Sequence, residues 1–219
     1  MTNYLYLDIE TIPAQSDSAR DYIARSAKVD SRLKDPAKIE AARVDAQADA
    51  VAKTSFDGWF GHVVCIAAAK DDGDIIVSCI KSLDEEAALI RALFSGLDQY
   101  HRPTLVGHNI AGFDVPFLTR RAVSLGIALP PSVCWPRDPK PWDSKINDTM
   151  VMAAGVKDRI GLDRLCNALG IPGKDGFDGS QVAEAWTRGE YDKIAAYCAD
   201  DVSRVRSIHQ KFMQAGWDA

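Results

Sequence analysis

Asp8 and Glu10 are two carboxylates at the end of the first apolar run of the sequence, residues 4–9. This run favours a β-strand, and residues two apart on a strand point from the same face. Apolar residues lie on both faces up to this point, so the strand is expected in the interior. Burying an unpaired carboxylate is costly, and such groups are normally paired or bound to metal. The pair predicts a metal site; a strand end that reaches solvent is the simpler alternative.

A third carboxylate interrupts the apolar stripe of the last predicted helix, residues 190–213. The stripe consists of Ile194, Cys198, Val205, Ile208 and Phe212. At about 100° per residue, Asp201 falls near the centre of this stripe, whereas Asp200 points towards solvent or a neighbouring loop. Tyr197 precedes Asp201 by about one turn, so both side chains can face one pocket. A polar residue at such a position indicates a functional site, with a structural salt bridge as the alternative.

A fourth carboxylate, Asp114, stands in the first turn of the helix predicted after the glycine-bearing turn 107–112. An acid at this position can simply interact with the helix dipole, and for Asp114 alone that explanation stays open. The four acids and the tyrosine are more specific together than any one of them.

Three short segments carry a resemblance to a known family. Residues 8–11 (DIET), 109–114 (NIAGFD) and 197–201 (YCADD) resemble, in order and rough spacing, the three motifs of the DEDD exonuclease superfamily. The tyrosine four residues before the last acid is typical of the DEDDy branch. The DEDDh branch requires a histidine where Ala196 stands, which excludes it. The resemblance is closest to the proofreading exonuclease domain of family B DNA polymerases, in a free-standing form.

This resemblance implies a ribonuclease H-like α/β fold, with a mixed five-stranded central sheet flanked by helices. It also implies a 3′→5′ exonuclease that uses two divalent metal ions, Mg²⁺ or Mn²⁺, which prefer carboxylate oxygens. Asp8 would bridge the two metals, Glu10 and Asp201 would complete the first, and Asp114 would support the second. Tyr197 would orient the attacking water.

The expected substrate is the 3′ end of a nucleic acid, from which mononucleotides are released. Thr11, Asn109 and Phe113 are substrate-binding candidates, Asn109 because the family pattern places it near the terminal nucleotide, although Phe113 also fits the core. Single-stranded DNA is favoured over RNA, since no helical RNA-binding appendage is visible. An exoribonuclease of the RNase D type is the alternative. A non-catalytic nucleic-acid-binding module would have no need of all four acids. Replication or repair proteins are the expected partners.

The remaining pattern predicts one α/β domain over residues 1–219. Strands are expected at 4–9, 62–69, 74–80 and 104–108. Helices are expected at 84–100, 112–125, 148–154, 162–169, 180–188 and 190–213. Two exposed helices form an insertion at about 17–53, where Asp35-Pro36 is a good helix start. The charge of the insertion is nearly balanced, which favours a solvated surface.

The composition narrows the class of protein. The 219 residues carry a net charge of −5, which argues against a passive nucleic-acid binder but not against a nuclease with an acidic metal site. The five cysteines are far apart in sequence, so a reduced, cytoplasmic compartment is expected. The N-terminal segment does not resemble a secretory signal, and no apolar run reaches the roughly 20 residues that span a bilayer.

Overall fold

A five-stranded mixed sheet forms the centre of the computed structural model, which describes residues 3–99, 102–140, 143–173 and 176–217. The strand order is β3-β2-β1-β4-β5. β1 pairs antiparallel with β2 and parallel with β4, β2 pairs antiparallel with β3, and β4 pairs parallel with β5. The strands are β1 (Tyr4–Ile12), β2 (His62–Lys70), β3 (Ile76–Cys79), β4 (Thr104–Gly107) and β5 (Ile146–Asp148). The predicted mixed α/β architecture is confirmed.

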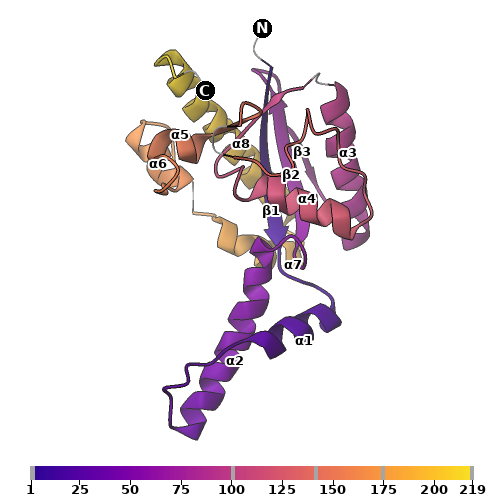
Figure 1. The fold of residues 1–219 in the computed structure, drawn as a ribbon, viewed down its shortest axis with the longest axis vertical. Helices are drawn as coiled ribbons and strands as arrows, with labels where there is room; N and C mark the ends of the chain where they lie inside the picture. Colours follow the sequence, from indigo (N-terminus) through magenta and orange to yellow (C-terminus); the bar gives the residue numbers. More distant parts are fainter. Residues whose placement is uncertain (1–2, 100–101, 141–142, 174–175, 218–219) are drawn as a thin grey trace.

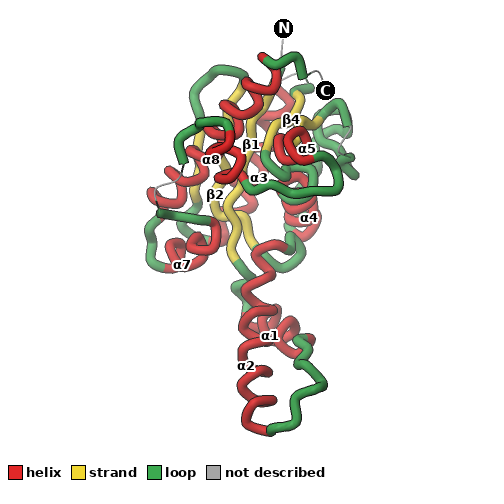
Figure 2. Tube along the Cα trace, turned by 90° about the vertical axis from the view of Figure 1, so that its left-hand side faces the viewer, coloured by secondary structure: helices red, strands yellow, loops and turns green. Residues whose placement is uncertain are grey.

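Helices cover both faces of the sheet (Figures 1 and 2). α8 (Tyr191–Gln214) packs along β1, β2 and β3, while α3 (Glu86–Gln99) and α4 (Asp114–Ser124) lie on the other face. The shorter helices are α5 (Thr149–Ala154), α6 (Leu162–Ala168) and α7 (Val182–Thr187). Three single 3₁₀ turns are η1 (Lys53–Phe56), η2 (Leu83–Glu85) and η3 (Gly179–Gln181). The sheet and its two helical layers enclose the main apolar core.

The fifth strand, β5, has no counterpart among the strands located from the residue pattern. It is only three residues long and two of them are polar, so neither hydrophobicity nor alternation reveals it. Asp148 was instead predicted to begin a helix, and it does cap α5 by accepting a hydrogen bond from the Met150 backbone N–H. Tyr100, the predicted end of α3, lies outside the described residues.

The predicted insertion forms an arm that leaves the body where β1 ends (Figures 1 and 2). It contains α1 (Asp17–Ser26) and α2 (Pro36–Ala52), and Asp35 caps α2 through the backbone N–H groups of Ala37 and Lys38. Neither helix has a fully buried residue. Charged neighbours pair locally, as in Arg32–Asp30, Arg43–Glu40 and Lys53–Asp49. Exposed pairs of this kind add little stability. With no fully buried residue in its helices, the arm is surrounded mainly by solvent.

The position of the acids depends on how far β1 extends beyond its parallel neighbour. β4 pairs only with Tyr4, Leu5 and Tyr6, so the following part of β1 has no strand on that side. Alternation along β1 then places Tyr6, Asp8 and Glu10 on the face covered by α8. The register with β2 shifts by one residue between Glu10 and Thr11, and the pairing then continues to Ile12.

A buried polar network fixes α8 against the sheet. The His209 Nδ1 atom lies 3.0 Å from the Tyr6 hydroxyl, and the Asn147 amide donates to Nε2 at 2.9 Å. Burial lowers the pKa of His209 to about 4, so the ring is neutral at physiological pH. The network joins α8 to β1 and β5, the strands on either side of β4.

A second buried network ties the opposite helical layer to β2. Glu86 accepts two hydrogen bonds from Arg121 of α4, at 2.8 and 2.7 Å, and one from the Val63 backbone. His62 Nδ1 lies 2.9 Å from the same carboxylate. Burial opposes ionisation of Glu86, but these partners hold the pKa of its carboxyl below the usual range. The ion pair is therefore charged and buried.

Arg121→Met should lower the free energy of unfolding by about 3–5 kcal/mol, because it leaves the Glu86 carboxylate buried without its guanidinium. Adding Glu86→Gln should recover part of this loss, since the uncompensated charge is then removed. Urea denaturation of both variants measures the difference. A single variant within about 1 kcal/mol of the wild type would contradict a structural role for the pair.

No helix among the described residues is both long enough and apolar enough to cross a bilayer.

Candidate active site

Asp8 and Glu10 form the centre of the acid cluster. Their carboxylate oxygens and the sulfur of Cys198 all lie within 4.8 Å of one another. Cys198 comes from α8, so the sheet and the helix both contribute to the cluster. Glu10 is buried, and Asp8 is half-buried. The two predicted metal ligands therefore share one face at the interface between β1 and α8.

Asp201 approaches this cluster from α8. The helix has the register that its apolar stripe predicts: Asp201 is buried among neighbours such as Val202 and Val205, whereas Asp200 is exposed. The negative charge of Asp201 acts on both Asp8 and Asp114 and raises the pKa of each. Asp201 thus belongs to the same electrostatic cluster as the strand acids, and Asp200 does not.

Asp114 enters from the N-terminus of α4, in the opening that β4 leaves beside β1. It is buried, and a backbone hydrogen bond from Ile9 stabilises its charged form. Burial, and after it the charges of Asp148 and Asp201, nevertheless raise the pKa of Asp114 to about 7. An acid that only interacted with the helix dipole would remain at the surface. The structure instead brings Asp114 together with the other three acids.

The electrostatics of the cluster indicate what it can bind. Burial, and then the charges of Glu10, Asp114 and Asp201, hold the pKa of Asp8 well above its usual range. Carboxylates that repel one another in this way are relieved by a cation between them. Oxygen ligands suit hard divalent ions such as Mg²⁺ and Mn²⁺. The residues present therefore fit a divalent metal site.

Tyr197 stands one turn before Asp201 on α8. Its ring packs edge-on against Phe177, with ring centroids 5.0 Å apart. Burial, followed by the charges of Asp201 and Glu10, raises the pKa of the phenol well above its usual range. The hydroxyl is therefore protonated at neutral pH and can act as a hydrogen-bond donor. A cleft of about 600 Å³ opens beside it, lined in part by Phe177, Lys193 and Arg204.

Cys198 is a contact that sequence reasoning did not anticipate. Its sulfur lies 3.4 Å from Asp8 Oδ2, as a donor to that carboxylate. Burial raises the pKa of the Cys198 thiol well above its usual range, so it stays protonated. The sequence did place Cys198 on the stripe, three residues before Asp201. That spacing was the available signal, but it identified only a core residue.

Asp148 is a second residue whose role was underestimated. Besides capping α5, it accepts hydrogen bonds from the backbone N–H groups of Asn109, at 2.8 Å, and Ala111, at 3.1 Å. These bonds attach the turn before α4 to the end of β5. Asp148 therefore fixes the direction from which Asp114 enters the site.

Arg204 is the third unanticipated residue. Its buried guanidinium lies 2.5 Å from Asp200, 3.4 Å from Asp163 and 3.6 Å from Asp201. Asp200 is thus exposed but still linked to Asp201 through a shared cation. The i, i+3 and i, i+4 spacings on α8 were the signal in the sequence.

The three predicted substrate-binding residues lie next to the acids in sequence: Thr11 follows Glu10, and Asn109 and Phe113 precede Asp114. Asn109 adopts a left-handed conformation (φ 63°), and its carbonyl accepts hydrogen bonds from the N–H groups of Gly112 and Phe113. It therefore shapes the turn that leads to Asp114. Thr11 donates its hydroxyl to the Ser55 carbonyl at 2.7 Å. Phe113 is half-buried.

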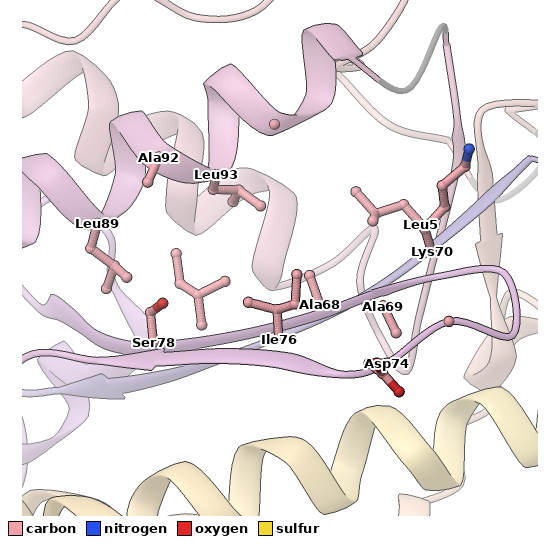
Figure 3. A pocket seen from close by; sticks show the side chains of 13 residues that line it. Leu5, Ala68, Ala69, Lys70, Asp74, Ile76, Ser78, Leu89, Ala92 and Leu93 are labelled. Atoms are coloured by element: carbon pink, nitrogen blue, oxygen red, sulfur yellow. The ribbon is translucent and has the colours of Figure 1, made fainter.

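A separate cleft of about 560 Å³ lies between α3 and strands β2 and β3 (Figure 3). Leu89 and Leu93 line it from the helix, and Ala68 and Ile76 line it from the strands. Ala68 points away from the face on which its neighbour Ala67 pairs with Asp8. The sheet therefore separates this apolar cleft from the acids.

Comparisons with known proteins give the family and the fold of the chain. A family model described as a predicted 3′-5′ exonuclease related to the exonuclease domain of PolB matches residues 58–215. The family B DNA polymerase from the hyperthermophilic archaeon Pyrobaculum calidifontis is similar in structure, with a TM-score of 0.62 and 19% identity. That match covers 97% of this chain and 25% of the polymerase chain, and at this identity it shows the fold alone. No curated protein matches the sequence. The expected ribonuclease H-like fold and the expected family are confirmed.

Adding Mn²⁺ or Mg²⁺ to the metal-free protein should raise its melting temperature by roughly 5–10 °C at about 100 times the Kd, because ions that bind only the native state stabilise it. Asp201→Asn should melt at least as high as the wild type in EDTA, since it removes one repelling charge, and should lose most of the metal response. Asp200→Asn should keep that response. Thermal melts of the three proteins test this, and a reversed order of the two variants would show that Asp201 is not a ligand.

Proposed function

Because the chain belongs to the family of predicted 3′-5′ exonucleases related to the exonuclease domain of PolB, we propose that it hydrolyses nucleic acid stepwise from the 3′ end and releases mononucleotides. The observation that carries this proposal is the meeting of four carboxylates from β1, α4 and α8 beside a protonated tyrosine. Such a set suits phosphodiester hydrolysis, where charge must be stabilised on both sides of the phosphorus.

Asp8, Glu10, Asp114 and Asp201 would hold two divalent ions, Mg²⁺ or Mn²⁺. When bound, these ions supply a nucleophile at neutral pH and neutralise charge on the attacking and leaving oxygens. The charges of Glu10, Asp114 and Asp201 all act on Asp8, so Asp8 would help to hold both ions. Glu10 and Asp201 would bind the first ion, and Asp114 the second.

Tyr197 would orient the attacking water through its hydroxyl. A phenol with a raised pKa is unsuited to remove a proton. It can donate a hydrogen bond, and its ring is held by Phe177. Positioning is therefore the role that its chemistry supports.

The proposed substrate is single-stranded DNA, with an RNase D-type exoribonuclease as the alternative, since carboxylates do not read the 2′-hydroxyl. Asn109, Thr11 and Phe113 would contact the terminal nucleotide. We further propose that residues 1–219 act as one exonuclease domain in the cytoplasm, beside replication or repair proteins. None of the five cysteines, all in the described part of the chain, forms a disulfide, which supports a reduced compartment.

End-labelled single-stranded DNA and RNA, digested in parallel with Mg²⁺ or Mn²⁺, should give a ladder that shortens from the 3′ end, with DNA degraded faster. EDTA should abolish both reactions, and circular single-stranded DNA should resist. Cleavage of the circle would indicate an endonuclease, and faster loss of RNA would favour the exoribonuclease. Binding without cleavage in either metal would favour a non-catalytic module.

Tyr197→Phe should lower kcat by roughly 10- to 100-fold, which corresponds to about 1.4–2.7 kcal/mol of transition-state stabilisation. The metal-induced rise in melting temperature should be unchanged, because only a hydroxyl is removed. Asp201→Asn, by comparison, should lower kcat by several orders of magnitude. A Tyr197→Phe protein that turned over at the wild-type rate would assign the ring to packing alone.

A further inference from the structure

Phe56 is a large apolar side chain that the fold leaves in solvent. Its side chain is 70% exposed, although η1, which it ends, lies at the junction of the arm, β1 and α4. An isolated exposed apolar residue needs no explanation. The ring of Phe56, however, contacts Phe113, the residue before Asp114, and its backbone is firmly held.

Hydrogen bonds attach this backbone to the end of β1. Thr54 accepts a hydrogen bond from the Ala14 N–H at 2.8 Å and donates to the Val51 carbonyl at 2.5 Å. The Ser55 carbonyl accepts the Thr11 hydroxyl at 2.7 Å. Thr11 directly follows Glu10, so the residue before Phe56 contacts the residue after a predicted metal ligand.

Close packing restricts the segment further. A Cβ atom on Gly61 would lie 2.3 Å from the Thr54 carbonyl oxygen, and one on Gly58 would lie 2.6 Å from the Phe117 carbonyl oxygen. The backbone after η1 therefore touches both η1 and α4, with no room for a side chain. A ring on such a segment is presented to solvent in a defined place rather than on a loose loop.

Aromatic contacts continue from Phe56 towards the acids. Its ring meets Phe113 edge-on, with centroids 6.2 Å apart, and Phe113 packs on the buried Phe117 at 5.5 Å. Phe113 directly precedes Asp114. A row of three rings thus runs from the core, past the N-terminus of α4, to an exposed end at Phe56.

We propose that Phe56 is a stacking platform for an unpaired base near the 3′ end of the strand that occupies the candidate active site. This inference rests on the proposed function and specifies its substrate as a strand whose 3′ end is unpaired. Every base has a π-face, so stacking on an aromatic ring tolerates any sequence. A base within a duplex already stacks on its neighbours on both sides and cannot cover the ring. Phe56 also lies just before residue 58, where the family match begins, so that match does not include it.

The test compares Phe56→Ala, Phe56→Trp and the control Tyr22→Ala. Tyr22 is also an exposed aromatic residue, but its ring stacks on Phe60 and not on the residue before Asp114. On single-stranded DNA, Phe56→Ala should raise KM by about 5- to 150-fold, the range for one lost base–aromatic contact. Phe56→Trp should keep the wild-type KM because it retains an aromatic ring, and Tyr22→Ala should also leave KM unchanged. Melting curves check that each variant is folded.

Two further substrates separate this inference from the proposed function. Thymidine 5′-(p-nitrophenyl phosphate) has no neighbouring base, so Phe56→Ala should hydrolyse it as the wild type does. A series of DNA strands would each carry one abasic site within the last few nucleotides. For the wild type, the abasic site should raise KM at one position of the series. For Phe56→Ala, the abasic site at that position should not raise KM further. The stacking role would be overturned if Phe56→Ala had the wild-type KM for DNA, or if Tyr22→Ala raised KM as much as Phe56→Ala does. Neither outcome would contradict the nuclease activity. Wild-type protein inactive on every substrate would instead refute the proposed function.

Discussion

Mutual repulsion among closely spaced carboxylates is the interaction that the rest of the structure must oppose. Burial, and then the charges of Glu10, Asp114 and Asp201, hold the pKa of Asp8 well above its usual range. A fold can hold such a cluster only if rigid elements prevent the acids from moving apart. Nearby groups offset part of the cost: the Cys198 thiol donates to Asp8, Ile9 donates to Asp114, and Arg204 lies beside Asp201. The remaining repulsion makes the site receptive to cations.

Each rigid element is fixed by a polar residue near the site. Asp148 holds the turn that leads to Asp114, and Asn147 beside it bonds His209 of α8. His209 in turn contacts Tyr6, two residues before Asp8 on β1. The end of β5 therefore positions both α4 and α8 relative to β1, although it supplies none of the four predicted metal ligands. On the far face, Glu86 and Arg121 perform the corresponding task for α3 and α4.

The acids and the arm belong to different parts of the fold. The acids come from β1, α4 and α8, regular elements of the body. The arm and η1 lie between β1 and β2 in the sequence. Neither helix of the arm has a fully buried residue. Local ion pairs engage three of the arm's lysines and arginines, namely Arg32, Arg43 and Lys53. The base of the arm is attached to the end of β1, where the Thr11 hydroxyl donates a hydrogen bond to the Ser55 carbonyl oxygen.

The sequence by itself determined the periodic features: the mixed α/β class, the arm, the face shared by Asp8 and Glu10, and the burial of Asp201 rather than Asp200. These follow from the periods of strands and helices, which local residues set. Only the tertiary structure decided the position of β5, because a strand of three residues is defined by its partner and not by its own pattern. The contacts of Cys198 and Asp148, and the contact of Arg204 with Asp163, were likewise decided there. Each joins segments that are far apart in sequence or depends on which face of a helix meets which neighbour, and no local period encodes that pairing.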